Sequence, residues 1–137
     1  MKFTRVISIL IATALVYSSM PPTQAAVVDK HIISDINDHW AESHITTLTY
    51  ADILRGSGGM ANPDNNITRG EFAALVSRTL SLSAKDTDLF YDVPKEHIFR
   101  KEITSAAQAG IIKGVGNGIF APEMNITREE IMLMISR

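Results

Sequence analysis

The stretch Ile67-Thr68-Arg69-Gly70-Glu71-Phe72 decides the organisation of this chain, because it returns as Ile126-Thr127-Arg128-Glu129-Glu130-Ile131, 59 residues later. Upstream of each copy, further apolar positions match at almost the same spacing. Ile45, Leu48, Ala51 and Ile53 pair with Ile103, Ala106, Ala109 and Ile111, each 58 residues later. A repeat at a fixed period predicts one supersecondary unit used twice.

Each unit shows the pattern of a helix, a glycine-rich loop and a second helix. In the first unit, Asp38 or His39 can cap a helix that carries Ile45 on its apolar face. Asp52 and Gly110 stand at matching places after the first helices, where the left-handed backbone of a C-terminal cap is expected. The sequence therefore predicts an all-α fold of tandem helix–loop–helix repeats.

Thr68 with Glu71, and Thr127 with Glu130, have the spacing of capping boxes at the start of the second helices. The arginines between them, Arg69 and Arg128, are not needed for capping, and a positive charge there opposes the helix dipole. Free amides and a guanidinium together can bind a carboxylate or phosphate. The alternative is that each arginine is solvated or paired with an acidic loop residue.

The N-terminal segment has the features of a secretory signal peptide. Lys2 and Arg5 precede an apolar stretch at 6–17, and small residues around Ala25 offer a cleavage site. We expect a signal peptide at 1–25, a short linker at 26–32, a first repeat at 33–80, a connection at 81–88 and a second repeat at 89–137. The second repeat stops before its last helix could complete a third turn, as a truncated unit would.

Composition narrows the function classes. The 137 residues carry a net charge of −2 and no cysteine, which gives no overall attraction to nucleic acid and no disulfide. After cleavage of the signal peptide, no membrane attachment is expected. The sequence lacks the motifs of hydrolases, metalloproteases and phosphate-binding loops, so we predict no enzyme activity and no cofactor.

Other polar and aromatic residues give weaker indications of a site. Trp40 is the only tryptophan, and it suits either a core position or a sugar contact. His39 and His44 have the wrong spacing for one helical face, and the acidic loop at 62–66 lacks the glycine and glutamate of a calcium loop. No metal site is predicted.

The residues quoted above, together with Asp35, His39-Trp40-Ala41, Gly56 and Pro63, resemble the S-layer homology repeat, and the segment from Phe90 to Arg137 resembles a second copy. Members of that family usually carry three repeats that close a pseudo-threefold bundle, so two repeats would form an incomplete one. The second unit also has His97-Ile98 where the first has His39-Trp40.

The resemblance implies a secreted protein at the cell surface, in the cell wall or S-layer, that binds pyruvylated secondary cell-wall polysaccharide. It further implies that Arg69 and Arg128 receive the glycan carboxylate, with Trp40 as a possible sugar contact. The alternative function is a protein–protein interaction module, or a fragment of a longer surface-layer protein or exported enzyme.

A two-repeat chain should leave apolar helix faces partly exposed, namely those with Ala106, Ala107 and Ala109 and with Met132, Met134 and Ile135. We therefore expect a homo-oligomer or a partner that supplies a third repeat.

Overall fold

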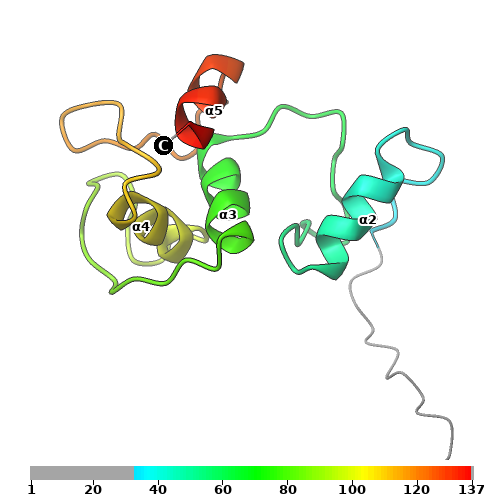
Figure 1. The fold of residues 1–137 in the computed structure, drawn as a ribbon, viewed down its shortest axis with the longest axis horizontal. Coiled ribbons are helices and arrows are strands. Elements are labelled where there is room, and N and C mark those ends of the chain that lie inside the picture. The colour runs from blue at the N-terminus through cyan, green and yellow to red at the C-terminus, as the bar shows by residue number, and fades with distance from the viewer. Residues whose placement is uncertain (1–32, 137) are drawn as a thin grey trace, which may run out of the picture. The chain divides into compact units, whose positions relative to one another are not determined.

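The computed structural model describes residues 33–136, and within that range it contains helices and no strands. The helices are α2 (Glu42–Tyr50), α3 (Arg69–Thr79), α4 (Arg100–Gln108) and α5 (Arg128–Ile135). Helices α2 and α3 come from the first repeat, and α4 and α5 from the second (Figure 1). The predicted all-α fold with two helix–loop–helix units is confirmed. The expected signal peptide and linker lie outside the described residues.

The core consists of two clusters, and their boundary does not coincide with the boundary between the repeats. A small cluster made by Ile33, Ile36, Ala41 and Ile45 holds the first half of repeat one together. The larger cluster contains residues of repeat two together with Ala73 of α3. Helix α3 packs directly against α4 (Figure 1). The closing helix of repeat one therefore completes the core of repeat two.

The larger core is the main source of apolar burial among the described residues. Its buried members are Ala73, Val93, Ile103, Ala106, Ile112, Phe120 and Met134. The expectation of an exposed small-residue face on α4 is therefore wrong for Ala106, because α3 and the loop residues cover it. Met134 is also buried, whereas Met132 and Ile135 are exposed as expected.

The turns between helices follow the backbone chemistry of their residues. Asp52 and Gly110, which come directly after the C-caps of α2 and α4, have φ values of 60° and 77°. The predicted left-handed caps are confirmed. The predicted N-cap of α2 is wrong, because the helix begins after Ala41 without a side-chain cap. His39 accepts instead, through Nδ1, the N–H of Ala41 at 3.2 Å.

An aspartate holds each glycine-rich loop in the same way. Asp35 accepts the N–H groups of Ala61 and Asn62 at 2.8 and 2.7 Å. Asp92 accepts those of Phe120 and Ala121 at 2.9 and 2.6 Å. The N–H of Ala61 is the main cause that lowers the pKa of Asp35 below its ordinary value. These aspartates fix the loops on which the candidate site depends.

Candidate anion site at the helix starts

Both capping boxes form as predicted. At α3 the hydroxyl of Thr68 accepts the N–H of Glu71 at 3.2 Å, and the Glu71 carboxylate accepts the N–H of Thr68 at 2.8 Å. At α5 the matching distances for Thr127 and Glu130 are 3.3 and 2.9 Å. The two helices therefore begin with the same local geometry, and differences between their arginines arise from the surroundings.

Arg69 is buried inside the protein, with 3% of its surface exposed. Its guanidinium donates from Nη1 to Oε1 of Glu130 at 2.7 Å, from Nε to the carbonyl of Phe120 at 3.0 Å and from Nη2 to the carbonyl of Lys113 at 3.1 Å. It also lies 5.0 Å from the centre of the Phe120 ring. All three partners belong to repeat two, so Arg69 joins the two repeats.

The backbone at the start of α3 is occupied as well. The N–H groups of Arg69 and Gly70 donate to the carbonyls of Met124 and Pro122, both at 2.9 Å. A Cβ atom at Gly70 would come within 3.1 Å of the Pro122 carbonyl and 3.2 Å of the Phe99 ring. The open anion site expected at Arg69 is thus filled in this structure by Glu130 and by the loop of repeat two.

Arg128 has the same place in its box and very different surroundings. It is exposed, and no hydrogen bond or ion pair joins its guanidinium to another residue between 33 and 136. Next to it, the pKa of Glu129 is lowered by its own backbone N–H and by the hydroxyl of Thr127. The Glu129 carboxylate therefore interacts with the positively polarised N-terminus of α5. The Arg128 guanidinium is the group at this helix start that stays exposed and unpaired among the described residues.

Trp40 is not a core residue. Its side chain is 83% exposed at the start of α2, beside the ring of His39 at a centroid distance of 5.5 Å. Ile98, at the matching place in repeat two, is exposed as well. The structure thus excludes a core position for Trp40 and leaves its indole face accessible.

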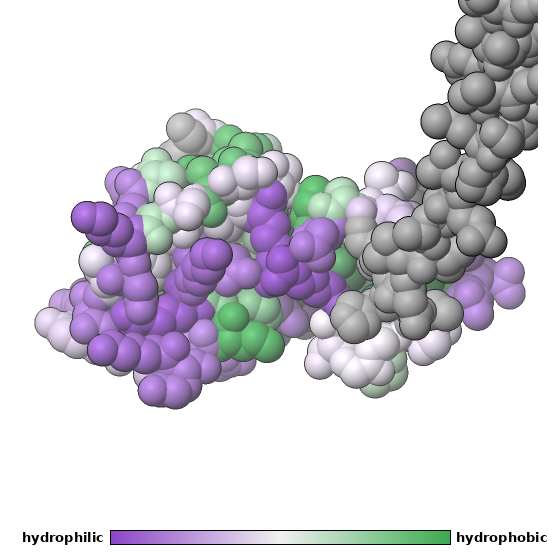
Figure 2. Space-filling view, turned by 90° about the horizontal axis from the view of Figure 1, so that it is seen from below, coloured by the Kyte–Doolittle hydropathy of each residue, from purple (hydrophilic) through white to green (hydrophobic). Residues whose placement is uncertain are grey.

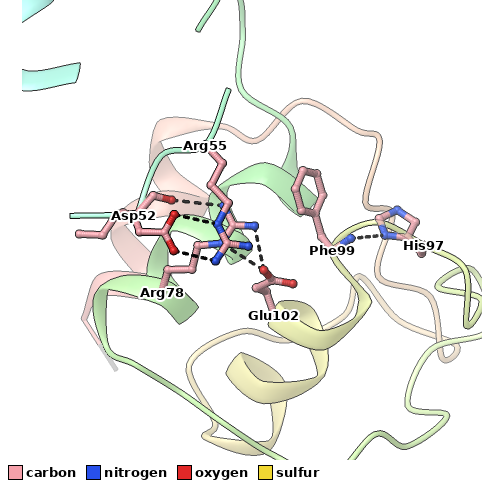
Figure 3. A network of polar contacts seen from close by, with 7 residues as sticks. Asp52, Arg55, Arg78, His97, Phe99 and Glu102 are labelled. Atoms are coloured by element: carbon pink, nitrogen blue, oxygen red, sulfur yellow. Dashed lines mark hydrogen bonds and ion pairs between the residues drawn. The ribbon is translucent and has the colours of Figure 1, made fainter. Parts of the chain in front are cut away.

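Arg78, which the sequence reasoning did not single out, also holds the two repeats together. Arg78 of α3 donates from Nε and Nη2 to Glu102 of α4 at 3.0 and 2.8 Å, and from Nη1 to the carbonyl of Ile53 at 3.3 Å (Figure 3). Near it, Arg55 donates to Asp52 at 3.2 and 3.0 Å. These contacts tie the end of α3 to α4 and to the segment after α2.

Arg100 anchors the connection between the repeats to α4. Its side chain is buried and donates to Asp86 at 2.6 Å, to Asp88 at 2.7 Å and to the carbonyl of Val93 at 2.6 Å. Repeat one has Glu42 at the matching place, so the internal repeat gave no signal for this role. The hydrogen bond from Arg100 is the main cause that lowers the pKa of Asp88.

This ion pair predicts an acid-sensitive stability. Because the pKa of Asp88 is lower in the folded protein, its contribution is complete above its ordinary pKa of 3.8 and is lost as the pH falls through the lowered value. The melting temperature should fall between about pH 5 and pH 2. In Asp88→Asn this fall should be smaller, because the amide does not titrate. Equal acid sensitivity of both proteins would contradict the assignment.

Within residues 33–136 no group of three or more histidine or carboxylate side chains is placed to hold a metal ion. In the same range, no helix has the length and apolar character needed to cross a membrane.

Comparison with known proteins identifies the repeats. The S-layer homology domain matches residues 32–73 and 89–132. The chain is 30% identical over 138 residues to an endoglucanase of Bacillus sp. (strain KSM-635), which covers 96% of this chain and 15% of that protein. It is 30% identical over 129 residues to the S-layer protein sap of Bacillus anthracis, which covers 93% of this chain and 16% of that protein.

A third relative is the cellulosome-anchoring protein of Acetivibrio thermocellus, 32% identical over 110 residues, which covers 75% of this chain and 25% of the relative. The chain thus spans a quarter or less of the length of these relatives. The S-layer relatives place it at the cell surface, in the cell wall. The chain therefore belongs to the S-layer homology family, and its repeats are cell-surface anchoring modules.

Proposed function

We propose that the chain anchors itself by binding pyruvylated secondary cell-wall polysaccharide, with Arg128 as the residue that receives the glycan carboxylate. The observation that supports this is the contrast between the two boxes. Arg69 already holds the carboxylate of Glu130, whereas Arg128 is exposed and has no such partner among the described residues.

The contact between Arg69 and Glu130 supports a carboxylate as the ligand of the matching arginine. A guanidinium at the first residue of the helix takes a carboxylate at 2.7 Å while the capping box next to it stays intact. The pyruvyl group of a glycan carries the same functional group. A bidentate contact with Arg128 would therefore have charge-assisted strength and a defined orientation.

The other candidate residues have supporting roles. Thr127 and Glu130 hold the start of α5, where Arg128 is the first residue of the helix. Thr68 and Glu71 do the same for Arg69. A glycan carboxylate could reach Arg69 only by displacing Glu130, so Arg69 acts first as a residue that joins the repeats. Trp40 offers an exposed ring against which the apolar face of a sugar can pack.

Binding to cell walls stripped of protein tests the proposal. Arg128→Ala should weaken binding by about tenfold to hundredfold, which corresponds to about 1.5–3 kcal/mol for a charged hydrogen bond. The matched control is Lys101→Ala, which removes one exposed positive charge on α4 and should bind as the wild type does.

A second experiment varies the cell wall instead of the protein. Walls that lack the pyruvyl group should bind the wild type as weakly as intact walls bind Arg128→Ala. Trp40 is the only tryptophan, so its fluorescence reports whether soluble glycan fragments reach that ring. Undiminished binding of Arg128→Ala, or equal binding to walls without pyruvyl groups, would overturn the carboxylate mechanism.

A further inference from the structure

The exposed face of α5 corresponds, through the internal repeat, to a face that is buried on α3. On α3 this face consists of the buried residues Arg69, Gly70, Ala73, Ala74 and Ser77. The repeat places Arg128, Glu129, Met132, Leu133 and Ser136 at the same positions on α5, and all five are exposed. Helix α5 is held to the core from its other side, through Met134. It therefore carries a docking face without an occupant among the described residues.

The structure also shows what such a face binds. The face of α3 lies against α4, whose Ile103 and Ala106 share a core with Ala73 and whose Glu102 pairs with Arg78. The equivalent helix in repeat one is α2. Its matching residues are Ile45, Leu48 and His44, of which Leu48 is half-buried and His44 exposed. Ile45 is buried in the cluster of its own repeat. Among residues 33–136, the exposed face of α5 and the part of α2 around Leu48 and His44 therefore have no helix packed on them.

Side-chain sizes at the two faces are complementary. In the contact within the chain, Gly70 leaves room for the Phe99 ring, which a Cβ atom would approach to 3.2 Å. On α5 the glycine is replaced by the larger Glu129, and on the receiving side Phe99 is replaced by the smaller Ala41. Likewise Phe120, which covers Arg69, has Ala61 as its counterpart. The larger docking face therefore meets a receiving surface with two smaller side chains.

We propose that a second copy of this chain occupies the face, with α5 of one copy packed on α2 of its partner. The contact is heterologous, since each copy uses a different surface, and it extends the arrangement that joins α3 to α4 within one chain. It covers the exposed side chains of Met132 and Leu133. Figure 2 shows hydrophobic residues exposed between hydrophilic ones on the face that it displays.

By the internal repeat, Glu71 of the partner copy stands where Glu130 stands against Arg69, so docking and glycan binding compete for Arg128. The ring of Phe120 covers the guanidinium of Arg69, whereas Ala61 in the receiving repeat has no ring to cover Arg128. The proposal itself does not depend on glycan binding. It is therefore tested on the protein alone, in the absence of cell walls.

Sedimentation of the full chain, expressed with its own N-terminal segment and recovered from the secreted fraction, tests the interface. At micromolar concentration the wild type should associate, and Leu133→Glu should weaken association at least tenfold. Ile135→Glu is the matched control. Ile135 is 65% exposed against 56% for Leu133, lies on the same helix outside the docking face, and should leave association unchanged.

A mixing experiment distinguishes this contact from a symmetric pairing of α5 with α5. Leu48→Glu alters the receiving face and leaves α5 intact, so on its own it should also associate at least tenfold more weakly than the wild type. A mixture of Leu48→Glu and Leu133→Glu should form a complex of one copy each, because one variant keeps α5 and the other keeps α2. A monomeric wild type, or association of Leu48→Glu equal to that of the wild type, would overturn the proposal. Circular dichroism establishes that each variant is folded.

Discussion

Replacing Arg69 by alanine is expected to lower the free energy of unfolding by about 3–5 kcal/mol, because the change leaves a charged partner without its counter-ion inside the protein. Glu130 keeps some access to water, with 29% of its side chain exposed, so the lower end of that range is expected. The carbonyls of Lys113 and Phe120 lose a donor at the same time. Denaturation in urea measures the effect.

The control for this prediction is the same substitution in the other box. Arg128→Ala removes an exposed side chain and should change the free energy of unfolding by no more than about 0.5 kcal/mol. Conversely, Arg128→Ala should impair wall binding. Two equal losses of stability would show that the boxes have equivalent surroundings in solution, contrary to the structure.

The local features of the fold were predictable because they depend on residues close together in the sequence. The Thr-x-x-Glu spacing predicted both capping boxes, and Asp52 and Gly110 predicted the left-handed turns after α2 and α4. Each of these features needs only the backbone of one helix end. The repeat then predicted that the second unit would have the same elements as the first.

The pairing of helix faces was not predictable in the same way. The apolar positions of α3 indicate that it buries a face, but not that the partner is α4 of the other repeat. For that reason Ala106 was expected at the surface and lies in the core. The different fates of Arg69 and Arg128 follow from the same contact, since Glu130 comes from the other unit.

One sequence signal for this contact was present. Gly70 is the residue at which the first box differs from the second, where Glu129 stands. A glycine in the first turn of a helix gives no advantage to the helix itself, and it allows another segment to approach closely. In the structure that segment is the Pro122 loop, whose carbonyl accepts the N–H of Gly70 at 2.9 Å. The glycine thus marked the box that is covered.

Phe120→Ala is expected to lower the free energy of unfolding by about 3–5 kcal/mol, the usual cost of removing a fully buried aromatic side chain. The ring lies 5.3 Å from that of Phe90 and covers the Arg69 guanidinium, so its loss leaves a cavity beside a buried charge. Urea denaturation measures the change, and Ile98→Ala, at an exposed apolar residue in the same repeat, should cost no more than about 0.5 kcal/mol.

A loss below about 1 kcal/mol for Phe120→Ala would mean that the loop collapses into the space. In that case the phenyl ring would not be what seals Arg69 between the repeats.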